Sequence, residues 1–93
     1  MKYIRNNDFV MREIVGESFL IPIGDIAREF NGMITLNNMS AFIWKNLENA
    51  CTVDDLVKAI MERYEAEESQ VKVDVQEFIA RMKQMKMLEE IAE

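Results

Sequence analysis

The sequence of residues 33–56, MITLNNMSAFIWKNLENACTVDDL, contains the point at which the hydrophobic pattern of the chain changes. Residues 33–36 are a short apolar run that predicts a strand. Beyond this run the apolar period rises from two to about 3.6, which predicts a helix that begins behind the N-cap candidates Asn37 and Asn38. The apolar face of that helix would carry Met39, Phe42, Ile43 and Leu47.

Two further strands are predicted upstream of this point. Residues 9–15, FVMREIV, and residues 19–23, FLIPI, are rich in β-branched and aromatic residues, and a turn signal lies between them at residues 16–18. We therefore expect a β-hairpin in which Pro22, which cannot donate a ladder hydrogen bond, lies at an edge or at the end of its strand. A connection over residues 25–31 would complete a three-stranded antiparallel sheet.

Two more helices are predicted downstream. Thr52 is a candidate N-cap for a second helix, whose amphipathic stripe ends at Tyr64. Ser69 is a candidate N-cap for a third helix that runs to about Met85. For residues 87–93 the pattern allows either an extension of this helix or a short apolar segment that closes on the core. The predicted fold is α+β, with three strands followed by three helices.

The length and composition exclude several classes of protein. The chain has 93 residues, a net charge of −6, no histidine and one cysteine. Its length fits one domain over residues 1–93, in which the polar residues 1–8 would be flexible. Without histidine the usual general base and zinc ligand are missing, and Cys51 alone cannot form an internal disulfide or a cysteine-rich metal site. We expect no enzyme activity, no cofactor and no metal.

The same composition bears on partners and location. A net charge of −6 repels the phosphate backbone, so the chain is a poor candidate for nucleic-acid binding. No apolar run approaches the roughly 18 to 20 residues needed to cross a bilayer, and the first residues do not resemble a signal peptide. These features predict a cytoplasmic protein with no membrane partner.

Most residues with chemical potential are better explained as structural. Adjacent carboxylates such as Asp54 and Asp55 point about 100° apart on a helix, so they suit solvated helix ends better than an acid–base pair. Cys51 suits a small filler between helices, and Trp44 a core anchor that fixes the first helix to the sheet. Among the eight methionines, Met61, Met82 and Met85 are expected in the core, whereas Met33, Met39 and Met87 could line a recognition surface.

The predicted sheet has the most functional content. A three-stranded sheet exposes at least one edge of unpaired N–H and C=O groups, which either stays bare, guarded by charge, or accepts a strand from another chain. The strand at residues 33–36, followed by an amphipathic helix, would offer a peptide both main-chain hydrogen bonds and an apolar trough. Both alternatives remain open from the residues alone.

Several segments in order resemble one family. They are MITLN at residues 33–37, AFIWKNLE at 41–48, TVDDL at 52–56, Tyr64, DVQEFI at 74–79, and the Met87–Leu88 pair. Together they resemble the PqqD-like proteins, the peptide chaperones of pyrroloquinoline quinone biosynthesis, known more broadly as the RiPP recognition element. The resemblance covers residues 9–89. The chain departs from the family at two turns. Residues 49–51 stand where members often have Gly after the first helix, and Lys86 stands where members often have Gly before the final apolar pair.

This resemblance implies a winged helix-turn-helix-like fold that catalyses nothing and binds the leader segment of a ribosomally made precursor peptide. The leader would add as a strand beside residues 33–36, in the groove between this strand and the third helix, and would be presented to a modifying enzyme, often a radical S-adenosylmethionine maturase. The strand residues would be Met33, Ile34, Thr35 and Leu36. The helix residues that match the family motif are Asp74, Val75, Phe78 and Ile79, and extrapolation along the same face adds Arg81, Met82 and Met85.

Charges on the third helix suggest a preference for particular leaders. Arg81, together with Lys83 or Lys86, would favour acidic leader residues. Two functions from other classes stay open: a winged-helix DNA-binding regulator, and a structural subunit or homodimer in which the open edge pairs with another copy of the chain. The chain itself is expected to be a monomer or a weak dimer.

Overall fold

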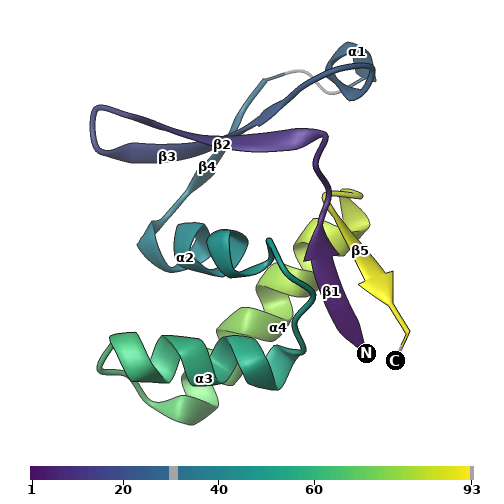
Figure 1. Cartoon of the computed structure of the whole chain (residues 1–93). Coiled ribbons are helices and arrows are strands. Elements are labelled where there is room, and N and C mark those ends of the chain that lie inside the picture. Colours follow the sequence, from purple (N-terminus) through teal and green to yellow (C-terminus); the bar gives the residue numbers. More distant parts are fainter. Residues whose placement is uncertain (30–31, 93) are drawn as a thin grey trace.

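The computed structural model describes residues 1–29 and 32–92 and shows five strands and four helices in this part of the chain. In Figure 1 a three-stranded sheet lies at the top, α2 beneath it, α3 at the bottom, and a two-stranded sheet at the right. The elements are β1 (Lys2–Arg5), β2 (Phe9–Ile14), β3 (Glu17–Pro22), α1 (Ile26–Glu29), β4 (Ile34–Leu36), α2 (Asn38–Asn46), α3 (Val53–Arg63), α4 (Glu68–Gln84) and β5 (Leu88–Ile91). The α+β fold class is confirmed, and residues 30 and 31 of the predicted connection lie outside the described residues.

The predicted hairpin is β2 and β3, which pair antiparallel from Phe9–Pro22 to Ile14–Glu17. Its turn is Val15–Gly16, one residue earlier than predicted, and the φ angles of +51° and +80° are those of a two-residue turn that matches the strand twist. Such a turn is closed by a hydrogen-bonded pair, Ile14 with Glu17, and bonded and non-bonded pairs then alternate along the ladder. Pro22 falls in a non-bonded pair at the end of its strand, where its missing N–H costs nothing.

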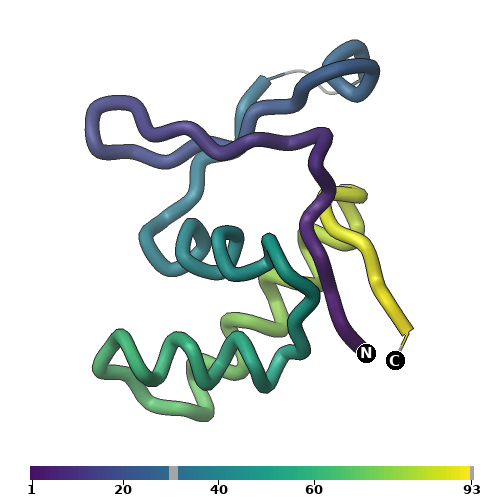
Figure 2. Tube along the Cα trace, viewed as in Figure 1, coloured from purple at the N-terminus to yellow at the C-terminus, as the bar shows by residue number. Residues whose placement is uncertain are grey.

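The sheet formed by the two chain ends was not predicted. β1 pairs antiparallel with β5, from Lys2–Ile91 to Arg5–Leu88, and Figure 2 shows these terminal segments side by side. Residues 1–8 were expected to be flexible, but a strand occupies half of them. Backbone bonds from Tyr3 to Cys51 and from Arg5 to Leu47 attach β1 to the α2–α3 connection. These partners are far apart in sequence, so no local pattern signals the pairing.

A Schellman motif resolves the alternative left open for residues 87–93. The N–H of Lys86 donates to the carbonyl of Lys83 at 3.0 Å, and the N–H of Met87 donates to that of Met82 at 2.9 Å. Lys86 has a φ of +59°, which ends α4 and turns the chain into β5. Met82 and Met87 are fully buried across this motif. Met87 is therefore a core residue, and its predicted place on a recognition surface is wrong.

The helix starts are specified by their first residues, with one exception. Asn37 caps α2 by accepting from the N–H of Ser40 at 2.8 Å. Thr52 and Asp55 form a reciprocal capping box at the start of α3, which lowers the pKa of Asp55 through its hydrogen bonds to Thr52. α4 begins at Glu68 without a side-chain cap, and Ser69 lies inside the first turn, so the prediction of Ser69 as N-cap is wrong.

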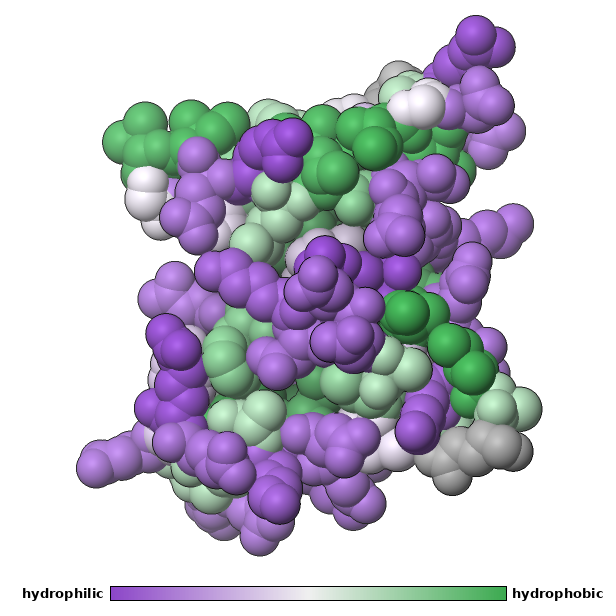
Figure 3. All heavy atoms as spheres, in the orientation of Figure 1, coloured by the Kyte–Doolittle hydropathy of each residue, from purple (hydrophilic) through white to green (hydrophobic). Residues whose placement is uncertain are grey.

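One apolar core joins the three-stranded sheet to α2, α3 and α4. Trp44 is 1% exposed at its centre, which confirms it as a core anchor of α2. Of the methionines expected in the core, Met82 is fully buried, and Met61 and Met85 are partly buried and pack against the core. Figure 3 shows apolar surface at the hairpin end of the sheet, where Val15 is 98% exposed, above a largely hydrophilic helical half. Within residues 1–29 and 32–92, no helix is long and apolar enough to cross a membrane.

Candidate functional site

One edge of β4 is open among the residues that the structure describes. The strand order is β2–β3–β4, and within residues 1–29 and 32–92 β4 pairs only with β3, through Ser18–Leu36, Phe19–Thr35 and Leu20–Ile34. Glu17 and Phe19 direct their backbone groups towards β2, so Ser18 and Leu20 direct theirs towards β4. Their partners Leu36 and Ile34 therefore bond to β3, and the N–H and C=O of Thr35 point away from the sheet. Another strand can pair with Thr35 without disturbing the β3–β4 ladder.

The side chains of β4 divide as this pattern requires. Ile34 and Leu36 are 9% and 6% exposed and face the core, whereas Thr35 is exposed on the other face. Met33, just before the strand, is 54% exposed. The strand is thus held in place from one side by its apolar residues, while its outer edge stays accessible.

A cavity of about 340 Å³ begins at the residue that follows β4. Its walls are the start of α2 and the middle of α4. Buried Ile43 and Phe78 and half-buried Met39 provide apolar surface, and the remaining lining is polar or charged. The lining residues are Asn37, Met39, Ser40, Ile43, Asp74, Glu77, Phe78 and Arg81. The open strand edge and the cavity therefore adjoin at Asn37, which follows β4 and caps α2.

The structure brings together part of the predicted site. Asp74, Phe78 and Arg81 from α4 line the cavity, and they lie on one face because they are spaced by four and three residues. Val75, Ile79 and Met82 are 0%, 5% and 0% exposed and belong to the core behind that face. Met85 is half-buried against the core, one residue beyond α4. Direct contact of these four residues with a ligand stays a prediction. Their burial favours a supporting role behind the cavity wall.

Five cavity residues were not among the predicted site residues. Glu77 follows Asp74 by three positions on α4, so helical spacing alone could have identified it. Met39 had been noted as a candidate for a recognition surface, and its place in the cavity wall fits that interpretation. The other three are Asn37, Ser40 and Ile43, which α2 contributes with its first two turns. The sequence pattern alone could not show that this part of α2 faces α4.

The charges at the cavity do not follow the predicted pattern. Arg81 lies at the cavity. Lys83 instead forms an ion pair with Glu90 of β5, which raises the pKa of Lys83. Lys86 occupies the left-handed position of the Schellman motif that ends α4. Two carboxylates, Asp74 and Glu77, stand beside Arg81. The lining therefore carries one more negative than positive charge.

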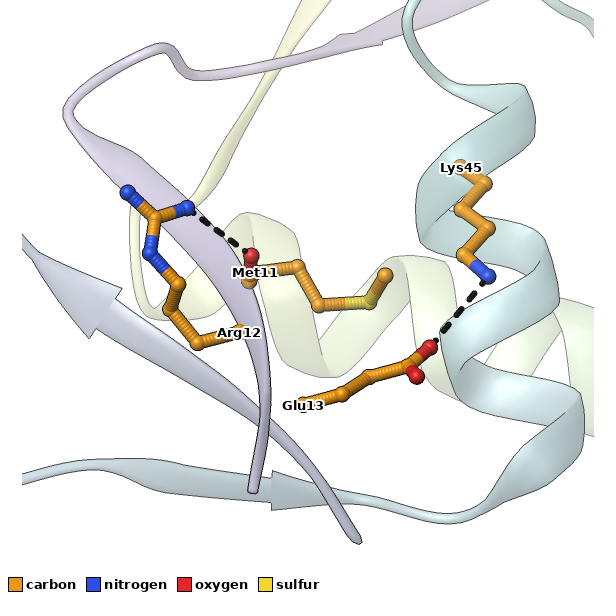
Figure 4. A network of polar contacts seen from close by, with 4 residues as sticks. All are labelled: Met11, Arg12, Glu13 and Lys45. Carbon is orange, nitrogen blue, oxygen red and sulfur yellow. Dashed lines mark hydrogen bonds and ion pairs between the residues drawn. The ribbon is translucent and has the colours of Figure 1, made fainter. Parts of the chain in front are cut away.

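A second cavity, on the hairpin side of α2, is bounded by contacts that brace the hairpin. Figure 4 shows Lys45 of α2 reaching Glu13 of β2, with the Nζ and Oε1 atoms 3.6 Å apart. The guanidinium of Arg63 lies 5.3 Å above the ring of Phe42, which also meets the ring of Tyr64 edge to face at 5.6 Å. The ion pair thus connects the hairpin to α2, and the ring contacts connect α2 to the end of α3.

Cys51 has a structural environment. Its Sγ lies 3.2 Å from the carbonyl oxygens of Asn46 and Asn49, and its backbone pairs with Tyr3. Burial, with a smaller contribution from Asp55, raises the pKa of the thiol. A raised pKa disfavours the thiolate, so the environment supports a packing role rather than a nucleophile.

The fold and site define a small winged-helix-like α+β protein with an open strand edge beside a helix-walled cavity. The chain belongs to the PqqD family, because the family model described as Coenzyme PQQ synthesis protein D (PqqD) matches residues 17–88. This match runs from the start of β3 to the first residue of β5 and so includes β4 and both cavity walls. The predicted family is confirmed. None of the curated proteins compared with the chain matches it.

Two solved structures share the fold over nearly the whole chain. One is described as TbiB1 in complex with the TbiA(beta) leader peptide; it has 21% sequence identity and a TM-score of 0.75, and the match covers 97% of this chain and 99% of that one. The other is lasso peptide synthetase B1 complexed with the leader peptide, with 16% identity, a TM-score of 0.76, and coverage of 97% and 100%. The winged helix-turn-helix-like description of the fold agrees with these likenesses.

Proposed function

We propose that this protein binds the leader segment of a ribosomally synthesised precursor peptide and presents it to a modifying enzyme, without catalysing a reaction itself. The leader adds as a strand to the outer edge of β4 and places a side chain in the cavity between α2 and α4. The observation that carries the proposal is the position of the open edge, which ends where the cavity begins. Membership of the PqqD family and the leader peptides bound in both similar structures support it.

The available contacts can supply useful affinity. Thr35 offers one donor and one acceptor, and each backbone hydrogen bond contributes about 0.5 to 1.5 kcal/mol net. A large apolar side chain that becomes buried against Met39, Ile43 and Phe78 adds about 1.5 to 3 kcal/mol. Ordering a flexible leader costs about 2 to 5 kcal/mol. Several contacts must therefore act together, so the leader has to engage both the strand edge and the cavity.

A proline at position 35 tests the strand addition directly. Thr35→Pro removes the N–H that faces the incoming strand, and proline is tolerated at an edge position whose N–H points to solvent. The matched control is Thr35→Ala, which keeps the N–H and alters the same side chain. The probe is a fluorescein-labelled synthetic peptide that covers the leader of a precursor encoded beside this chain, and circular dichroism checks the fold of each variant.

The expected result is a loss of affinity of about 5- to 50-fold for Thr35→Pro, from the lost hydrogen bond and the ring that obstructs the incoming strand, with less than twofold for Thr35→Ala. If a folded Thr35→Pro variant binds the leader as well as Thr35→Ala does, strand addition at β4 is wrong.

The modifying enzyme is proposed to be a radical S-adenosylmethionine maturase, and both proteins would act in the cytoplasm. The test uses purified maturase and precursor with and without this chain, followed by mass spectrometry. The chain should accelerate modification of the full precursor, have no effect on a precursor without its leader, and leave the precursor mass unchanged when the maturase is omitted. Equal rates with and without the chain would contradict the presenting role.

A further inference from the structure

The charged residues of the α4 wall are arranged so that they can discriminate between peptides. Asp74, Glu77 and Arg81 all line the cavity, and Phe78 lies between them as the apolar contact. Glu77 and Arg81 are exposed, while Asp74 is half-buried and accepts a hydrogen bond from Gln70 at 2.9 Å through Oδ1. The apolar surface of the cavity is therefore bordered by groups that a bound peptide would approach with its own charges.

Among the described residues, Glu77 and Arg81 do not form an ion pair with each other. An acidic residue four positions before a basic one on a helix is well placed to form an ion pair. Within residues 1–29 and 32–92, however, no ion pair or hydrogen bond joins these two side chains to each other or to other side chains. By contrast, Lys45 of α2 forms an ion pair with Glu13, and Lys83 of α4 forms one with Glu90. The fold therefore leaves the charges at the cavity available for a ligand.

The signs of these charges differ along α4. Asp74 and Glu77 make the N-terminal side of the α4 cavity wall negative, and Arg81 lies four residues beyond Glu77, about 6 Å along the helix axis. Two residues of an extended peptide span about 6.6 Å, so a strand running along α4 moves its side chains from Glu77 to Arg81 when it shifts by two residues. A basic peptide side chain is attracted at the first place and repelled at the second.

We propose that this groove selects an extended peptide in which a Lys or Arg lies two positions from the large apolar residue that enters the cavity, so that both side chains face α4, and that Asp74 and Glu77 are the residues that determine this specificity. Arg81 fixes the register, since it opposes the two-residue shift that would otherwise preserve the side-chain alternation. The inference rests on the proposed function and names the class of leader. It replaces the sequence-based expectation of an acidic leader, because two carboxylates and one guanidinium face the cavity.

The first experiment is a selection from a phage-displayed library of random 12-residue peptides on the full chain. The wild-type protein should enrich peptides in which a large apolar residue has Lys or Arg two positions before or after it. Asp74→Asn/Glu77→Gln should enrich the same apolar residues without the basic bias, and Glu77→Lys should shift the bias towards Asp and Glu. The matched control Glu62→Gln/Glu65→Gln removes two exposed carboxylates elsewhere and should select like the wild type.

Affinities of the selected consensus peptide give the magnitude. Exposed ion pairs contribute about 0.2 to 1 kcal/mol, so Asp74→Asn/Glu77→Gln should weaken binding about 1.4- to 5-fold per lost pair at low salt, and the difference should shrink at high salt. Replacement of the peptide Lys by Gln should cost the wild type the same factor and the double variant almost nothing.

The outcomes separate this inference from the proposed function. Selected peptides that bind more weakly to Thr35→Pro but show no charge bias, or an acidic bias, overturn the inference and leave the strand-addition site intact. Selected peptides whose binding is indifferent to Thr35→Pro contradict the proposed function instead. An equal response of the Glu62→Gln/Glu65→Gln control would show that only the overall charge matters, and would also overturn the inference.

Discussion

The turn of the β2–β3 hairpin contains a strained residue whose replacement should stabilise the protein. Val15 has a φ of +51°, and its side chain is 98% exposed. The left-handed region costs an L-residue about 1 to 2 kcal/mol, and β-branched residues are disfavoured there more than Asn, which commonly precedes Gly in this type of turn. Val15→Asn should therefore relieve strain and lose no buried contact.

The expected gain is about 1 kcal/mol in the free energy of unfolding, which corresponds to a rise in Tm of about 4 to 8 °C for a chain of this size. Thermal and urea denaturation followed by circular dichroism would measure it. The control is Val73→Asn, which replaces another exposed valine. Val73 lies on α4, is 45% exposed and does not have a positive φ, so this change should lower stability slightly. A Val15→Asn variant no more stable than the wild type would refute the strain argument.

Two further predictions concern helix ends. Lys86→Gly places glycine at the left-handed position of the Schellman motif, where Lys86 has a φ of +59°, and should raise the free energy of unfolding by up to about 1 kcal/mol in a urea titration; a decrease would contradict the assignment of this turn. Asp55→Asn weakens the α3 capping box and should destabilise the protein at pH 7. Because the pKa of Asp55 is lowered in the fold, its contribution is complete above the unfolded pKa of about 3.9 and disappears as the pH falls through the folded pKa, so the stability difference between wild type and variant should vanish there. A difference that persists unchanged in acid would show that the carboxylate charge is not involved.

The elements that the sequence predicted are those specified by local chemistry. The hairpin has strands rich in β-branched and aromatic residues and a glycine turn, α2 has Asn37 as its cap, and α3 has the Thr52 capping box. The β1–β5 pair could not be predicted in this way, because Lys2 and Ile91 are at opposite ends of the sequence and their strands are only four residues long. Ser69 was misassigned because α4 begins one residue before it, with Glu67 at the N-cap position, and the Ser69 hydroxyl donates to the Glu67 carboxylate.

The candidate site was predicted in part for the same reason. Spacing on one helix correctly grouped Asp74, Phe78 and Arg81, but periodicity could not tell which apolar residues of α4 face the core and which face a cavity. Val75 and Met82 are indistinguishable from Phe78 by hydrophobicity, and only the tertiary arrangement, in which α4 packs against α3 and shares a cavity with the start of α2, separates them. The α2 wall of the cavity depends on how the helices are placed in space, and no pattern within either helix specifies that.

An open strand edge that accepts a peptide must also avoid pairing with other copies of the same protein. β4 has three residues, which limits the number of hydrogen bonds that two such edges can form with each other. The chain carries a net charge of −6, and its cavity adds Asp74 and Glu77 beside that edge. A second copy would bring mostly like charge to this groove, whereas a basic peptide would bring opposite charge. The same two carboxylates that select a basic leader therefore oppose self-association at β4, and this argues against the homodimer alternative on physical grounds.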